Sequence, residues 1–529
     1  LERSRLEAFV RLGQGAGEQA SLALRCERMQ ATREANGALR ARWDGVVADL
    51  LGAVTARVPS LEATRMGGAL ALSARDLKLV VPGAGTLVAA DHFEARVAND
   101  EARVVVKPPT IAGNPPTPAG AMEATFDLGW ADGFKPRGDL FLRTIPATAL
   151  APLLRRAGIS VAAGTANFEL HVRPAAGPEA GVAGSFAGAV SGLDVHHPRL
   201  DRVPWRDVSL SLEGTGAYSP RDRRLELKEG AITALGLSAA LAGWLTLNPA
   251  FAGELRVSPP PKTAKACAEA FATWPAPLRT RLAGLIVSGR LGVTGRLRFD
   301  ERNWDDLGLS LNLAPLCQVV AEPNAITDLR QGRTPRVAEM VQIKDLPAHV
   351  VGAFLTAEDG GFRRHDGFDI EMIRRALAHD MAMGTLSKGA STLSQQVAKN
   401  LFLGPERTIA RKLAELVLTW RLEEAVGKDR ILELYLNIVE LGPNLRGLGA
   451  AATRYFGKPA SALSPLEAAH LASLLPNPLG FARRFREGRI DDGWLHKLYD
   501  LLGRMQRSGY LSTAALQAAR AETLALRRQ

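Results

Sequence analysis

Cysteine is scarce in this chain of 529 residues, which has only Cys26, Cys267 and Cys317. No two of them form a Cys-x-x-Cys pair, and no His-Cys cluster with metal-ligand spacing is present. This excludes a disulfide-rich scaffold and gives no sign of a structural zinc site. Whether Cys267 pairs with Cys317 in an oxidising compartment stays open.

Long apolar runs are also lacking. No stretch of about 18 apolar residues occurs, so no segment of this sequence is expected to span a bilayer. The first residue is Leu1 rather than methionine, and we therefore expect a mature or truncated form whose anchor or signal lies outside it. The net charge of +11 suits nucleic acid, anionic head groups or diphosphates, and charge alone does not choose among them.

The length predicts two to four domains, and the patterning divides them. Residues 1–60 are predicted helical, with Gly37 and Gly45 as the only breakers between 25 and 51. Residues 61–315 alternate apolar and polar side chains in short segments, which predicts a β-rich envelope domain of unknown role. Helical interludes are expected near 147–157 and 264–285, and an exposed proline-rich loop at 108–118. A linker at 316–345 and a helical domain at 346–529 complete the prediction.

The fold class is thus multidomain α+β. The β-rich region is expected to be an antiparallel sandwich or a curved open sheet.

The first cluster of chemically competent residues runs from Glu358 to Asp369 and contains Asp359, Phe362 and His365. A glycine pair at 360–361 predicts that a helix ends near Glu358 and a loop follows. An acid at a helix end beside an apolar surface can serve as a general base. A polar surface turn explains the composition equally well.

The second cluster, from 388 to 400, predicts a helix capped by Ser391 or Thr392. Thr392, Gln395, Gln396 and Lys399 then fall at spacings of three and four, on one helix face. Hydroxyl, amide and ammonium groups without an acidic partner suit a sugar or a phosphate.

The third cluster places Arg407, Arg411 and Glu415 four residues apart along one helical stripe. An ion pair between Arg411 and Glu415 is the simpler explanation of that spacing. Arg407 differs, because a cation at a helix N-terminus provides a site for a diphosphate.

Four motifs in order resemble those of family 51 glycosyltransferases, the transglycosylase domains of penicillin-binding proteins and of monofunctional peptidoglycan glycosyltransferases. They are Glu-Asp-x-x-Phe-x-x-His-x-Gly-x-Asp from Glu358, Gly-Ala-Ser-Thr-Leu-Ser-Gln-Gln-x-x-Lys-Asn ending at Asn400, Arg-Lys-x-x-Glu from Arg411, and Lys-x-x-Ile-Leu-Glu-x-Tyr-Leu-Asn from Lys428. Ala390 and Ser394 are mild departures that remove no group the mechanism needs. Together the four motifs are highly specific.

The resemblance implies a lysozyme-like helical fold and polymerisation of lipid II onto a growing lipid-linked glycan, with inversion and release of undecaprenyl diphosphate. It implies Glu358 as general base and Glu415 as the second essential carboxylate. The substrate-binding positions it implies are Asp359, Phe362, His365, Ser391, Thr392, Gln395, Gln396, Lys399, Asn400, Arg407 and Arg411. It further implies a divalent cation, Mg²⁺ or Mn²⁺, at the diphosphate, and no organic cofactor.

The expected location is the periplasmic face of the bacterial inner membrane. Expected partners are the membrane surface and other envelope or cell-wall proteins, with no nucleic acid. About 50 residues follow Pro478, so no transpeptidase domain is expected in this sequence. Two alternatives stay open: a murein-cleaving enzyme with Glu358 as general acid, and a non-enzymatic envelope protein.

Overall fold

The structure is a computed structural model of the chain. It describes residues 2–12, 20–50, 54–81, 85–109, 120–130, 135–155, 157–175, 181–248, 250–259, 266–290, 292–312, 317–333, 339–385, 389–485 and 490–527. The chain divides into two compact units. The first comprises residues 1–279 and 287–318, and the second comprises 280–286 and 319–529.

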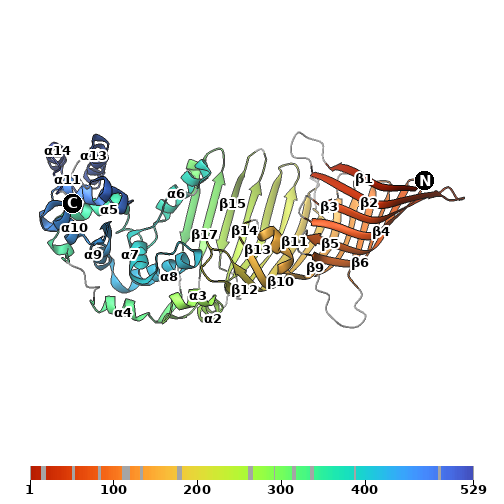
Figure 1. Cartoon of the computed structure of the whole chain (residues 1–529), viewed down its shortest axis with the longest axis horizontal. Helices are drawn as coiled ribbons and strands as arrows, with labels where there is room; N and C mark the ends of the chain where they lie inside the picture. The colour runs from red at the N-terminus through yellow and green to blue at the C-terminus, as the bar shows by residue number, and fades with distance from the viewer. Residues whose placement is uncertain are drawn as a thin grey trace. The chain divides into compact units, whose positions relative to one another are not determined.

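The first unit is built on one 17-stranded sheet, in which strands that follow one another in the chain lie side by side (Figure 1). The strands are β1 (Glu2–Leu12), β2 (Ala20–Arg33), β3 (Leu39–Leu50), β4 (Val54–Met66), β5 (Ala69–Val81), β6 (Gly85–Ala98), β7 (Glu101–Lys107), β8 (Gly120–Gly129), β9 (Lys135–Pro146), β10 (Ser160–Pro174), β11 (Val182–His196), β12 (Trp205–Ser219), β13 (Arg224–Ala234), β14 (Leu237–Thr246), β15 (Ala252–Ser258), β17 (Thr294–Asp300) and β18 (Gly308–Asn312). Successive members pair antiparallel, from β1–β2 to β17–β18.

The prediction of β structure after residue 61 is confirmed, and a single sheet rather than a sandwich carries it. The predicted helical interludes are confirmed as η1 (Ala147–Leu150) with α1 (Ala151–Arg155), and as α2 (Cys267–Ala272) with α3 (Ala276–Arg281). The proline-rich stretch at 110–118 lies outside the described residues.

The prediction of a helical segment at residues 1–60 is wrong, because the described residues of this range form β1, β2, β3 and the first half of β4. In β3, Leu39, Ala41 and Trp43 alternate with charged residues, and this period-two pattern governs the backbone. The two glycines predicted to interrupt a helix have left-handed backbones instead. Gly37 has φ +85° in the β2–β3 turn, and Gly45 has φ +61° inside β3.

A disulfide joins Cys267, at the start of α2, to Cys317, just before β19 (Gln318–Ala321). It settles the pairing that the sequence left open. Cys26 is free and buried.

The second unit is helical and holds the large core. Its helices are α4 (Asn324–Arg330), α5 (Ala348–Glu358), α6 (Ile370–Met383), α7 (Leu393–Phe402), α8 (Ile409–Val426), α9 (Lys428–Ile438), α10 (Leu448–Phe456), α11 (Pro465–Ser473), α12 (Pro478–Arg484), α13 (Asp492–Arg507) and α14 (Thr513–Ala521), with short η3 (Ile343–Asp345) and η4 (Ala460–Ala462). The short η2 (Trp304–Asp306) belongs to the first unit. Two small sheets complete the chain, β16 (Ile286–Ser288) with β19 and β20 (Glu440–Gly442) with β21 (Leu445–Arg446).

The core of the second unit surrounds α5, which buries Val350, Ala353 and Phe354 completely. Helices α7, α9 and α11 contribute further fully buried apolar side chains to the same cluster. This packing fixes the C-terminal end of α5, where Glu358 lies. Among the described residues, no helix is both long and apolar enough to cross a membrane.

Candidate active site

Glu358 is the last residue of α5, as the glycine pair after it predicted. Its carboxylate Oε2 accepts a hydrogen bond from the Gln396 Nε2 amide on α7 at 2.9 Å. Burial raises the pKa of Glu358, while the Gln396 hydrogen bond and the charge of Lys399 act to lower it. A carboxylate with a raised pKa that still carries a hydrogen-bond partner is suited to accept a proton near neutral pH.

Asp359, the next residue, is buried and holds the loop after α5 through hydrogen bonds. Both carboxylate oxygens lie 3.1 Å from His365 Nε2, and Oδ2 also accepts the Leu393 backbone N–H at 3.0 Å. The Gly367 N–H donates to His365 Nδ1 at 3.2 Å. Since Nδ1 is the acceptor, Nε2 carries the hydrogen and donates the hydrogen bond to the Asp359 carboxylate. Asp359 therefore ties the loop after α5 to the first turn of α7.

The predicted polar face of α7 is partly buried: Thr392 and Gln395 are buried, whereas Gln396 and Lys399 are partly accessible. Thr392 caps α7 in a capping box with Gln395, and both side chains are buried. Thr392 Oγ1 also donates to the Gly367 carbonyl oxygen at 2.7 Å. Thr392 and Gln395 therefore use their polar groups inside the protein, and the substrate contacts predicted for them stay a prediction.

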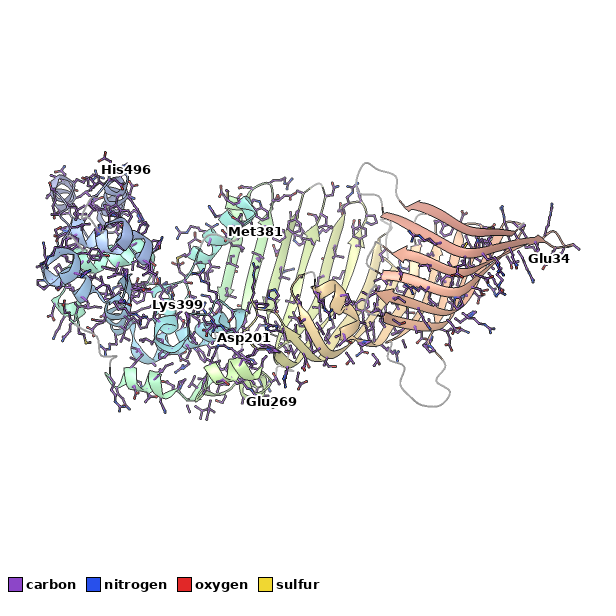
Figure 2. The ribbon with its side chains drawn as sticks, in the orientation of Figure 1. Glu34, Asp201, Glu269, Met381, Lys399 and His496 are labelled. Carbon is purple, nitrogen blue, oxygen red and sulfur yellow. A yellow bond between two sulfur atoms is a disulfide. The ribbon has the colours of Figure 1, made fainter. Side chains whose placement is uncertain are left out.

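Lys399 and Gln396 form the part of that face that remains accessible, and both are half-buried. Figure 2 labels Lys399 on α7. Burial lowers the pKa of Lys399, the carboxylates of Glu415 and Glu358 act to raise it, and the cations of α8 act to lower it. The Lys399 ammonium thus lies within the electrostatic reach of both Glu358 and Glu415.

Glu415 is buried on α8 and is held by two cations. Arg411 Nη1 donates to Oε2 at 2.6 Å, and Lys412 Nζ donates to Oε1 at 2.5 Å. The ion pair expected from the Arg411–Glu415 spacing is therefore present. The Arg411 Nε is buried and has no hydrogen-bond partner in the described structure. A buried donor without an acceptor is costly, and an incoming anion would satisfy it.

Lys412 was not singled out by the sequence, although it lies in the third motif. Its Nζ donates to Ser391 Oγ at 3.2 Å as well as to Glu415, so it connects the residue before the cap of α7 to α8. Its i,i+3 spacing from Glu415 is the signal that identifies it.

Arg407 and Asn400 are exposed. Arg407 directly precedes Thr408, the N-cap of α8, which agrees with its predicted place at a helix N-terminus.

A second contact network explains why the fourth motif accompanies the first two. Glu423 accepts hydrogen bonds from Ser394 on α7 and from Lys428 Nζ, the latter at 2.7 Å. Lys428 Nζ also lies 4.5 Å from the ring centroid of Phe362, which is buried. Phe362, predicted to contact substrate, thus packs in the core and anchors the loop through a cation–π contact. Sequence analysis missed Glu423 because its partner Ser394 is remote in the chain.

Among the described residues, those best placed for a metal are Asp359, His365 and Asp369 of the loop after α5, whose ligand atoms lie within 4.8 Å of one another. Their donor set does not fit well, because His365 already uses both nitrogens and Asp369 caps α6 through the Met372 N–H. Both carboxylate oxygens of Glu415 are occupied by its two cations. The predicted Mg²⁺ or Mn²⁺ at the diphosphate stays a prediction.

The helical unit is similar to known proteins. Residues 324–499 match the family model described as Transglycosylase. Three relatives are called biosynthetic peptidoglycan transglycosylase. The relative from Azoarcus sp. (strain BH72) is 49% identical over 27% of this chain and 63% of its own length. Those from Aromatoleum aromaticum and Salmonella paratyphi A are each 45% identical, over 30% and 31% of this chain and 70% and 69% of their own lengths.

This chain belongs to the peptidoglycan transglycosylase family. The family resemblance seen in the four motifs is thereby confirmed, for a matched region that lies entirely in the helical unit. The chain spans just under two thirds of the length of the Azoarcus relative. Among solved structures, penicillin-binding protein 1A from Haemophilus influenzae is 22% identical and covers 37% of this chain and 20% of its own, with a TM-score of 0.21.

Proposed function

We propose that this transglycosylase polymerises lipid II into glycan strands. Glu358 removes the proton from the 4-hydroxyl of the acceptor sugar, and that oxygen attacks the anomeric carbon of the lipid-linked donor. The bond to the diphosphate breaks with inversion, and undecaprenyl diphosphate leaves. The observation that carries the proposal is the half-buried Glu358 carboxylate, whose pKa is raised by burial and which lies within the electrostatic reach of the Lys399 ammonium.

The roles of the cations follow from where charge develops. The leaving diphosphate gains negative charge as its bond to the sugar breaks, and fixed positive groups stabilise that charge. Lys399, Arg411 and exposed Arg407 are available for this, and the orphaned Arg411 Nε needs an acceptor. Glu415 keeps Arg411 and Lys412 in place. Ser391, Gln396 and Asn400 are proposed to contact the sugars and phosphates.

The compartment proposed for this reaction is the periplasmic face of the inner membrane, where lipid II is presented. The Cys267–Cys317 disulfide supports an oxidising compartment. The membrane surface is the proposed partner, and exposed Met381 and Met383 at the end of α6 offer apolar side chains toward it (Met381 is labelled in Figure 2).

The decisive experiment follows polymerisation of purified lipid II by wild type and by Glu358→Gln. Glycan strands are expected from the wild type and none from the variant, because the amide cannot accept the proton. Glu371→Gln is a matched control, since Glu371 is an exposed acid on α6. Unchanged lipid II with wild type, or equal polymerisation by Glu358→Gln, would refute the proposal. Release of fragments from preformed murein would instead indicate a cleaving enzyme.

A further inference from the structure

The sheet of the first unit has two chemically different faces between β11 and β18. The strand register places one row of opposed residues across seven strands, and a second row runs parallel to it. The first row is Phe186, Gly214, Gly230, Leu241, Val257, Gly295 and Leu311, and the second is Gly184, Gly216, Leu227, Gly243, Leu255, Leu297 and Leu309. We call the surface formed by these two rows and their neighbour Leu212 the apolar face. None of its side chains has a polar atom.

The opposite face of the same strands is charged. Its members include Glu213, Glu226, Glu229, Glu254, Arg256, Arg296 and Arg298. Glu254 accepts a hydrogen bond from Arg296 at 2.6 Å, which places these two side chains on one side of the sheet. Because side chains alternate along a strand, the sequence keeps the two surfaces separate.

The apolar face is left open by the described part of the chain. Leu212 is 39% exposed, Leu255 38% and Leu311 39%. On β6, β7 and β8, by contrast, Ala90, Val106 and Ala124 form a buried cluster of their own. A contiguous exposed apolar surface of this kind usually marks a binding site for an apolar partner.

The apolar face has few depressions, because large side chains lie over several of its glycines. A Cβ added at Gly214 would meet Leu227 Cδ1 at 2.9 Å, and one at Gly253, next to the second row, would meet Phe299 Cζ at 2.9 Å. The surface therefore offers few of the pockets into which protein side chains insert at specific interfaces. Among the described residues it also offers no free strand edge between its outer strands, since β12, β13, β14, β15 and β17 are each paired on both edges.

We propose that the apolar face binds the polyprenyl chain of the lipid-linked substrate or of the released carrier. The proposal rests on the proposed function, which has this chain handle a polyprenyl diphosphate. A polyprenyl chain is uncharged and makes no hydrogen bonds, as the face requires. Six strand spacings of about 4.8 Å make the face about 29 Å wide, whereas one leaflet of a bilayer has a hydrocarbon depth of about 15 Å. The face can thus accommodate a chain longer than an ordinary acyl chain.

The test uses the whole chain and vesicles of three parts phosphatidylethanolamine to one part phosphatidylglycerol. The vesicles carry either a polyprenyl diphosphate with a photoreactive terminal group or a phosphatidylglycerol with a photoreactive acyl chain. Irradiation followed by peptide mass spectrometry should place the polyprenyl cross-links on β11 to β18. Leu212→Glu with Leu255→Glu should lower their yield at least about tenfold, because a charge on the face must be desolvated by the bound chain. Both residues are partly exposed, so the substitutions bury no charge in the free protein.

Ser211→Glu is the matched control, since Ser211 precedes Leu212 on β12 and lies on the opposite face. It should leave the cross-link yield unchanged. Cross-links only elsewhere, equal labelling by the phospholipid probe, or equal loss with Ser211→Glu would each overturn the proposal. So would a dimer of wild type that Leu212→Glu converts to a monomer, because the face would then bind a second copy.

The polymerisation assay separates this proposal from the proposed function. With a lipid II analogue whose chain is too short to span the face, the double variant at Leu212 and Leu255 should polymerise like wild type. Glu358→Gln should fail to polymerise and still be labelled on β11 to β18. Absence of labelling in a wild type that polymerises refutes only the binding proposal, and intact labelling without wild-type polymerisation refutes only the proposed function.

Discussion

Replacing Gln396 by methionine tests the electrostatics of the candidate base most directly. The substitution keeps a side chain of similar size and removes the amide that donates to Glu358 Oε2 at 2.9 Å. That hydrogen bond lowers the pKa of Glu358 against the burial that raises it. Its loss should therefore raise the pKa of Glu358 further.

The magnitude follows from the strength of one hydrogen bond to a partly buried carboxylate. Such a bond contributes about 1.5 kcal/mol, and one pKa unit corresponds to about 1.4 kcal/mol. We expect the acidic limb of the pH profile of kcat/KM for polymerisation to move up by about one pH unit. Because Glu358 must be ionised to accept a proton, the rate loss should be about tenfold greater below the limb than above it, where only the substrate contact proposed for Gln396 is lost.

The assay measures kcat/KM for lipid II polymerisation from about pH 5 to about pH 9 and follows the acidic limb of the profile. Gln395→Met is the control, since Gln395 is the neighbouring amide but is committed to the capping box of α7. It should reduce stability without moving the limb. An unmoved limb in Gln396→Met, or an equal shift in Gln395→Met, would refute the assignment of Glu358 as the titrating base.

Three further predictions concern stability. Glu415→Gln leaves Arg411 and Lys412 without their buried partner, and urea unfolding should show that the free energy of unfolding falls by about 2–3 kcal/mol. This loss is smaller than for a fully buried ion pair, because Lys412 is 40% exposed. A loss as small as that of the surface variant Glu371→Gln would contradict the prediction. Burial lowers the pKa of His470 to about 3, so the unfolded chain binds a proton below pH 6.5 that the folded chain does not. The free energy of unfolding should then fall by about 1.4 kcal/mol per pH unit between about pH 6 and pH 4 from this group, and His470→Gln should flatten the dependence; an identical slope in the variant would disprove this origin. Reduction of the Cys267–Cys317 disulfide, with a sequence separation of 50, should cost about 2–4 kcal/mol in the first unit. Cys26→Ser is its control, and equal unfolding midpoints with and without reductant would count against a structural role.

Local patterns in the sequence determined much of this protein. The alternation of Leu210 and Leu212 with Ser209 and Ser211 predicted a strand where β12 lies, and the glycine pair after Glu358 predicted the end of α5. The motif spacing predicted the Arg411–Glu415 ion pair, because residues four apart on a helix are neighbours whatever surrounds them.

Other features depended on contacts between residues that are remote in the chain. Residues 1–60 have the composition of a helix, yet the described part of this range forms strands, because each of β1 to β4 gains its hydrogen bonds from a neighbouring strand that local patterning does not reveal. The disulfide required the fold to bring Cys267 to Cys317.

The candidate site shows the same division. The sequence identified the reactive groups, Glu358, Lys399 and Glu415, since their chemistry belongs to the residue type. Only the tertiary structure decided which polar side chains remain accessible to a substrate. It turned Thr392 and Gln395 inward, joined Asp359 to the first turn of α7, and recruited Glu423 as an anchor. Burial and partner choice are properties of the packed chain, and they set the pKa of Glu358 that the proposed reaction requires.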